Sequence, residues 1–289
     1  MGIRILIITR LRTDVSNEAF FEQISADLGA GRTEGIQARV LEAAGSMDDP
    51  FEIIKCISLL KLVPQDGTES KLCGMLVDKA DAGNGLEIGT ALWNLGCPTF
   101  ALEIVKGLEP SDRTYRLQCH CLYDVEEYES ALDLYQRIKV PVINDRIMLS
   151  HIQSAVGEHT LAIKTASELL EEFPNDYDVR IAYVDALMMG GRDKEAAKYA
   201  RNAVKDKSAD SNAIAAYVLR IAGNIKASAG YATRAIQIDN GHIGAMESLG
   251  ICLAQKGEYD KARIVAGAIN EISPGDKKAV NILTYCEGN

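Results

Sequence analysis

One small residue recurs along most of the chain at nearly constant intervals. The six positions are Ala101, Ala131, Ala162, Ala196, Ser228 and Ala262. Successive positions are 30, 31, 34, 32 and 34 residues apart, and a period of about 20–50 residues is typical of stacked repeats. Two antiparallel helices approach closely only where a side chain is small. The spacing therefore predicts a series of helical hairpins with one small residue at each helix crossing.

The residues around Ala262 define the repeated unit best. Met246, Leu249 and Leu253 follow three- and four-residue spacing and predict a first helix with one apolar stripe. Gly257 breaks this helix, and Pro274 ends the next one. The second helix carries a stripe made of Tyr259, Ala262, Ala266 and Ile269. Two short helices joined by a glycine turn therefore form one unit.

Five further copies hold matching residues and begin near positions 82, 112, 143, 177 and 209. The copy at 143 keeps Gly157, Ala162 and Pro174 in the expected places, and the copy at 82 has Pro98 at the head of its second helix. Six copies in register predict one continuous repeat.

This unit resembles a tetratricopeptide repeat, because its Leu-Gly, Tyr, Ala and Pro spacing follows that family's pattern. No copy has the family's tryptophan at its start; Trp93 lies late in a first helix instead. The resemblance implies an all-α fold, an α-solenoid (right-handed superhelix) of antiparallel helix pairs. We expect an N-terminal helical region over residues 1–81, six repeats over 82–275 and a capping helix over 276–289.

The first 80 residues predict four helices that are either degenerate repeats or a distinct cap. The first follows Ser16 and closes at Gly29, and the second runs from Thr33 to Ala44. Asp49 and Pro50 are typical of a cap and a first-turn proline. Thr68 is expected to cap a fourth helix that reaches Ala80.

Both ends of a repeat array expose a face that a missing neighbour would bury. At the C-terminal end, the stretch from Asp276 to Tyr285 predicts a short amphipathic helix. At the N-terminal end, Ile3 to Leu11 is apolar but interrupted by two arginines, and it is predicted as a strand or as a helix on the end of the stack. It lacks the features of a secretion signal.

Charge and cysteine content narrow the classes of partner and compartment. The net charge of −10 disfavours nucleic acid, because phosphate binding requires a clustered basic face. No apolar run reaches the roughly 18 residues needed to span a bilayer. Seven scattered cysteines indicate reduced core residues in a cytoplasmic protein. Cys119 and Cys121 are not expected to chelate a metal, because neighbouring helix positions point apart.

Residues that carry catalysis are not recognisable in this chain. None of the four histidines has a partner in a nucleophile arrangement, and no glycine-rich phosphate loop is present. We therefore expect no enzyme activity, no catalytic residues, no cofactor and no metal.

The resemblance to tetratricopeptide proteins places function on the concave face, which the first helix of each pair lines. The matching positions are Trp93, Arg116, His120, Tyr123, His151, Asp185, Tyr217, Arg220 and Glu247. Aromatic and arginine side chains are common binding anchors. The alternative for any one of them is a core or solvated role, and Trp93 and Tyr217 could pack between helices.

The leading hypothesis is a non-enzymatic adaptor or scaffold that binds a segment of another protein in this groove, with a possible role in complex assembly. The asparagine and lysine set with which co-chaperones of this family hold a peptide carboxylate is absent, so chaperone-tail capture is not expected. Two alternatives remain: an RNA-binding helical repeat, and a homo-oligomer in which Ile3 to Leu11 inserts into the groove of a second copy.

Overall fold

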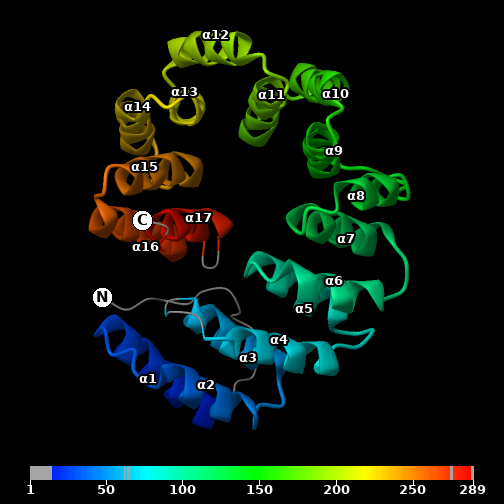
Figure 1. The fold of residues 1–289 in the computed structure, drawn as a ribbon, viewed down its shortest axis with the longest axis vertical. Coiled ribbons are helices and arrows are strands. Elements are labelled where there is room, and N and C mark those ends of the chain that lie inside the picture. The colour runs from blue at the N-terminus through cyan, green and yellow to red at the C-terminus, as the bar shows by residue number, and fades with distance from the viewer. Residues whose placement is uncertain (1–14, 62, 64–65, 274–275, 288–289) are drawn as a thin grey trace. The chain divides into compact units, whose positions relative to one another are not determined.

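The computed structural model describes residues 15–61, 63, 66–273 and 276–287. Every regular element in these ranges is a helix (Figure 1), which confirms the predicted all-α architecture of paired helices. The chain separates into two compact units, Met1–Glu126 (unit 1) and Glu127–Asn289 (unit 2). The expected division at residues 81/82 and 275/276 stays a proposal. None of the described helices combines the length and apolarity that a bilayer crossing requires.

Unit 1 contains seven helices in its described part. They are α1 (Val15–Gly29), α2 (Ile36–Ala44), α3 (Pro50–Leu60), α4 (Thr68–Lys79), α5 (Gly85–Asn94), α6 (Pro98–Lys106) and α7 (Asp112–Asp124). The four helices expected before residue 81 are therefore present. The predicted cap is also confirmed, because Asp49 Oδ1 accepts a hydrogen bond of 2.9 Å from the Phe51 amide and Pro50 begins α3.

Two predicted helix starts were wrong. The second helix begins at Ile36 rather than Thr33, because Gly35 takes a left-handed φ of 70° that no helix continues. Thr68 is the first residue of α4 and not its cap: Gly67 precedes it with a φ of 87°, and Asp66 accepts from the Thr68 amide. The α4 helix ends at Lys79, one residue before the expected end. The segment from Ile3 to Leu11 lies outside the described residues.

Unit 2 carries the most regular repeats. Its helices are α8 (Tyr128–Tyr135), α9 (Ile143–Ala155), α10 (His159–Glu172), α11 (Tyr177–Met189), α12 (Asp193–Ala203), α13 (Ala209–Ile221), α14 (Ile225–Ile238), α15 (Ile243–Gln255), α16 (Tyr259–Ile272) and α17 (Lys277–Glu287), with a 3-10 turn at Val204–Asp206. We call α9, α11, α13 and α15 the first helices and α10, α12, α14 and α16 the second helices. Each first helix packs against its own second helix and against the neighbouring first helices.

The recurring small residue occupies the fourth position of each second-type helix, α6, α8, α10, α12, α14 and α16. All six of these side chains are fully buried. For the helix pairs that lie within one unit, the facing position is twelve residues earlier and is also buried. Its occupants are Gly89 in unit 1 and Ser150, Val184, Ala216 and Gly250 in unit 2. Small residues thus meet from both helices of most pairs, as the period predicted.

Two hydrogen bonds show how closely the paired backbones approach at this crossing. Ser150 Oγ on α9 donates to the Ala162 carbonyl on α10 at 3.1 Å. Ser228 Oγ on α14 donates in the opposite direction to the Ala216 carbonyl on α13 at 2.7 Å. A one-carbon side chain can reach the facing backbone only when the helices are in close contact. The second observation also explains why serine replaces alanine at position 228.

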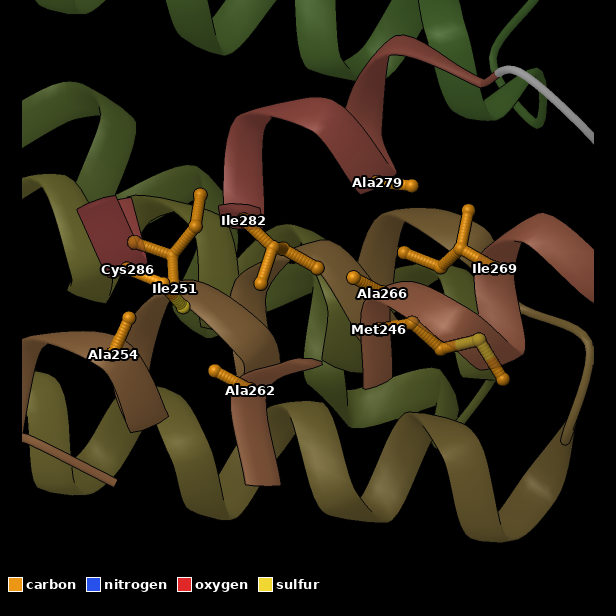
Figure 2. Packing of buried hydrophobic residues seen from close by; sticks show 9 residues of the cluster. All are labelled: Met246, Ile251, Ala254, Ala262, Ala266, Ile269, Ala279, Ile282 and Cys286. Atoms are coloured by element: carbon orange, nitrogen blue, oxygen red, sulfur yellow. The ribbon is translucent and has the colours of Figure 1, made fainter. Parts of the chain in front are cut away.

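The C-terminal core also contains a close helix contact at a residue without a side chain, Gly250. Met246 and Ile251 from α15, Ala262 and Ala266 from α16, and Ile282 from α17 belong to one buried cluster (Figure 2). A Cβ atom added to Gly250 would overlap the Ile282 side chain. The predicted C-terminal helix is therefore present as α17, and its Ile282 fills the space over Gly250.

The turn before each second-type helix requires one residue in the left-handed region. The residues are Gly96, Glu126, Gly157, Gly191, Gly223 and Gly257, with φ between 64° and 84°. In the glycine turns the next amide bonds back across the turn, as from Asn224 N to the Leu219 carbonyl at 2.8 Å, which is the Schellman arrangement. Among these six turns, Glu126 alone adopts this conformation with a side chain in place.

We expect Ala262→Leu to lower the free energy of unfolding by about 1–3 kcal/mol, because three extra carbons must fit into a full crossing. Ala268→Leu on the same helix is the control, since Ala268 is only half-buried. Thermal unfolding followed by circular dichroism measures both variants. An unchanged or raised melting temperature for Ala262→Leu alone would contradict the assigned crossing.

Glu126→Gly is expected to raise the free energy of unfolding by roughly 1 kcal/mol, since a left-handed residue with a Cβ is strained by about that amount. Gly223→Ala makes the opposite change, from glycine to a residue with a Cβ, and should lower the free energy of unfolding by a similar amount. A Cβ at Gly223 would meet no atom within 4 Å, so this variant isolates the backbone effect. Chemical denaturation gives both values, and effects of equal sign would refute the explanation.

Candidate partner-binding surface

All nine residues predicted to line the partner-binding face are half-buried. They lie on first helices or on the corresponding helices of unit 1: Trp93 on α5, Arg116, His120 and Tyr123 on α7, His151 on α9, Asp185 on α11, Tyr217 and Arg220 on α13, and Glu247 on α15. The structure brings Trp93 and His120 together in unit 1 and five of the other residues together in unit 2, while Arg116 and Tyr123 lie at other positions of α7. Their role in binding a partner stays a prediction.

The unit 1 group is centred on the single tryptophan. Trp93 Nε1 on α5 donates to Asp124 Oδ2 at the end of α7 at 2.7 Å. The His120 ring lies with its centroid 4.7 Å from that of Trp93. Trp93 therefore packs between α5 and α7, the alternative role expected for this residue, while it keeps a half-exposed face.

The unit 2 group, which we call the Asp185 cluster, consists of His151, Asp185, Tyr217, Arg220 and Glu247. Tyr217 on α13 and the Asp185 carboxylate on α11 lie close enough that Tyr217 lowers the pKa of Asp185 and Asp185 raises the pKa of Tyr217. The Arg220 guanidinium lies 5.2 Å from the centre of the Tyr217 ring. His151 Nε2 on α9 is 3.8 Å from Asp185 Oδ2, which is too long for a hydrogen bond. Three successive first helices therefore converge on one carboxylate.

Glu247 on α15 extends this group toward α17. Its Oε1 accepts a hydrogen bond of 2.8 Å from Asn281 Nδ2, and the charges of Lys278 and Arg220 also act on it. The side chains of Asp185 and Glu247 are close enough that the Glu247 charge disfavours ionisation of Asp185, and both charges disfavour ionisation of Tyr217. The cluster thus spans the first helices α9 to α15.

Sequence reasoning missed Tyr177, the first residue of α11. Its hydroxyl lies against the α15 backbone at Gly244, where a Cβ would overlap it, and its ring meets the His242 ring at 4.8 Å. His242 Nε2 is in turn 3.1 Å from Asp210 Oδ1 on α13. Glycine at position 244, in the first turn of α15, was the available signal, because a glycine in a helical pattern can mark a close approach.

Burial dominates the electrostatics of these groups. It raises the pKa of the Asp185 carboxyl to about 6, against the opposing effects of Tyr217 and Arg220. It also raises the pKa of Glu247 and lowers the pKa of His151, which favours a neutral imidazole. At both carboxyls, burial thus outweighs the neighbouring groups that favour the ionised form.

The first helices carry more acidic than basic side chains, whereas the second helices are balanced. The first helices have five Asp or Glu residues and three Arg residues, and the second helices have seven acidic and eight basic residues. Two of the three arginines are engaged elsewhere: Arg146 binds Glu172 on α10, and Arg180 is buried against Ser211 and Tyr199. Arg220 is the remaining arginine of the first helices.

The cysteines do not add a metal centre to the described part of the chain. All seven are free and buried, and the described residues contain no group of three His, Cys, Asp or Glu side chains placed to hold an ion. Cys119 and Cys121 both lie in the interior, as expected for core residues.

A tetratricopeptide repeat family model matches residues 147–213, from α9 into α13. This segment belongs to the tetratricopeptide repeat family. The resemblance drawn from the residue spacing is therefore confirmed. The match spans His151 and Asp185, so two members of the Asp185 cluster lie within tetratricopeptide repeats.

Solved tetratricopeptide proteins are similar to parts of the chain. MamA from Desulfovibrio magneticus RS-1 shares 14% identity over 56% of this chain and 94% of its own, with a TM-score of 0.32. A thermophilic TPR protein of Thermus thermophilus shares 15% over 71% and 98%, with a TM-score of 0.40. YrrB, described as a TPR protein with an unusual peptide-binding site, shares 17% over 74% and 97%, with a TM-score of 0.29. No curated protein sequence matches this chain.

The raised pKa of Asp185 predicts a pH-dependent stability. A carboxyl whose folded pKa exceeds its unfolded value contributes stability that is present below about pH 4 and is lost as pH rises through about 6. Wild-type protein should therefore lose up to about 3 kcal/mol of folding stability between these pH values, and Asp185→Asn should remove this loss. Denaturation of both proteins at pH 4 and pH 7 measures this difference. Parallel pH profiles would show that Asp185 is not desolvated.

Proposed function

We propose that the chain is a non-enzymatic protein-interaction scaffold whose first helices bind a segment of another protein. The family to which residues 147–213 belong supports an interaction role. The observation that carries the proposal is the Asp185 cluster, in which side chains from α9, α11, α13 and α15 form one half-buried polar surface. A bound partner segment would exclude the remaining water from these half-buried side chains.

The proposal assigns partner binding to the first helices and not to the second helices, because the two sets carry different kinds of polar contact. The second helices and their N-cap residues present ordinary exposed ion pairs, such as Lys261 with Glu258 and Arg192 with Glu195. Pairs of this kind contribute little to stability. The Asp185 cluster instead holds an arginine over an aromatic ring beside a desolvated carboxylate. Aromatic and arginine side chains in partly dry surroundings are typical binding anchors.

The same charge distribution argues against the RNA-binding alternative. Phosphates require clustered cations, and the first helices offer Arg220 beside several carboxylates. The buried free cysteines support a reducing compartment such as the cytoplasm. The proposed partner is therefore a protein segment, and a second copy of this chain is one form that it can take.

Site-specific photo-cross-linking tests the proposal. A diazirine-bearing amino acid placed at position 220 on α13 should capture a protein in cell extract. The same residue placed at position 263 on α16, where Arg263 is exposed, should not capture it. Mass spectrometry of the products distinguishes a foreign protein from a second copy of the chain. Absence of any protein product at position 220, or equal products at both positions, would reject the proposal.

A further inference from the structure

Two large apolar side chains are exposed at equivalent positions of neighbouring first helices. Met189 is the last residue of α11, and Ile221 is the last residue of α13. They are one repeat apart in the chain, and they are 57% and 49% exposed. We call these two residues the Met189–Ile221 patch. Exposed apolar residues are ordinary where they occur singly, so their pairing across adjacent repeats is the feature that points to a function.

The patch borders a core that α11 and α13 share. Met188 on α11 and Tyr217 on α13 are half-buried, and both pack against the same buried cluster of α11, α12 and α13. Met189 follows Met188 directly, and Ile221 lies one helical turn after Tyr217, on the same side of α13. The two exposed side chains therefore extend this shared core outward at the C-terminal ends of the two first helices.

The most exposed apolar side chain of the second helices has no such counterpart. Ile264 on α16 is 71% exposed. The equivalent residues of α10, α12 and α14 are Lys164, Lys198 and Gly230, so Ile264 stands alone among polar or absent side chains. It is an ordinary surface residue and provides a control for the Met189–Ile221 patch.

Arg220, the residue before Ile221, has a hydrogen-bond donor that the described residues do not satisfy. Its Nε atom is buried and has no hydrogen-bond partner among them, while its guanidinium carbon lies 5.2 Å from the centre of the Tyr217 ring. A buried donor without an acceptor costs free energy. A ligand that brings an acceptor to Arg220 removes this cost, after a small rotation of the flexible arginine side chain.

The charge around Arg220 is already balanced by the chain. Against the larger effect of burial, Arg220 lowers the pKa of both Asp185 and Glu247, and Lys278 also lowers the pKa of Glu247. Two cations and two carboxylates thus act on one another, so a charged side chain of either sign on a partner would meet a like charge there. A main-chain carbonyl meets no such repulsion. The acceptor that Arg220 lacks is therefore expected to be uncharged.

We propose that the partner segment bound by the first helices places an uncharged apolar side chain on the Met189–Ile221 patch and a main-chain carbonyl against Arg220. This inference rests on the proposed function and adds the chemical class of the partner, an apolar protein segment. The apolar side chain excludes water from Met189 and Ile221, and the carbonyl supplies the acceptor that Arg220 Nε lacks. Because these residues come from α11 and α13, one segment that crosses two repeats makes both contacts.

Association on this surface depends on apolar burial and one hydrogen bond. Methionine adapts to the shape of an apolar guest, because its side chain is unbranched and flexible. Burial of the patch removes two exposed side chains from water. Salt screens interactions between charges, and this contact brings no charged group of the partner. The affinity should therefore change little between low and high ionic strength.

Peptide display on the full chain tests this inference. The probe is a library of random peptides displayed on phage and selected on the immobilised protein. Enriched peptides should share a position occupied by leucine, isoleucine, methionine or phenylalanine, and they should show no excess of charged residues. The most enriched sequence is then made as a synthetic peptide with blocked ends, and titration calorimetry at low and high salt gives its affinity.

Matched variants locate the binding. The double variant Met189→Ser/Ile221→Ser should weaken binding of this peptide about tenfold, because two apolar contacts are lost. The control, Leu161→Ser/Ile264→Ser, removes apolar side chains that are 44% and 71% exposed on α10 and α16 and should leave the affinity unchanged. Arg220→Lys keeps the positive charge but removes Nε, and it should also weaken binding. Circular dichroism verifies that all three variants are folded.

Any of the following results would overturn the inference: no enriched peptide, enrichment of acidic or basic peptides, a strong salt dependence, equal weakening by both double variants, or full affinity of Arg220→Lys. A protein cross-linked at position 220 would leave the scaffold proposal standing in each of these cases, because that experiment does not depend on the chemistry of the bound segment. The two failures are therefore distinguishable.

Discussion

Close approach of two helices at a pair of small residues is the constraint on which the repeats depend. Ala162 and Ser150, or Ser228 and Ala216, bring two backbones near enough for a serine hydroxyl to bond the facing carbonyl. With the two helices of a pair held at this short distance, each first helix also contacts the first helices beside it. The polar residues of successive first helices then lie in one row, and that row holds the Asp185 cluster.

Much of the fold could be predicted because its determinants are local. The period of the small residue, the glycine turns and the Asp49–Pro50 cap each depend on a few neighbouring residues, and the structure contains all of them. Helix starts at Ile36 and Thr68 were missed, because a glycine in the left-handed region shifted each boundary. Glycine is compatible with both a turn and a helix start, so the exact helix boundary next to it depends on the surrounding packing and not on the local sequence.

The candidate site was only partly predictable. Matching residues to the family's first-helix positions found Asp185, Tyr217 and Arg220, which prove to be mutual neighbours. Tyr177 and Asp210 were missed, since their importance comes from contacts across three helices rather than from their place in one repeat. The degree of charge compensation likewise depends on which arginines are engaged elsewhere, as Arg146 and Arg180 are. Periodicity alone does not contain that information.

The hydrogen bond between Trp93 and Asp124 has a practical consequence for spectroscopy. Because Trp93 is the sole tryptophan of the chain, indole emission reports on the surroundings of α5 and α7 in unit 1. Tyrosines such as Tyr177 and Tyr217 supply the ultraviolet signal of the α9–α17 repeats. Selective excitation at long wavelength therefore observes unit 1 without a contribution from unit 2, and no added label is needed.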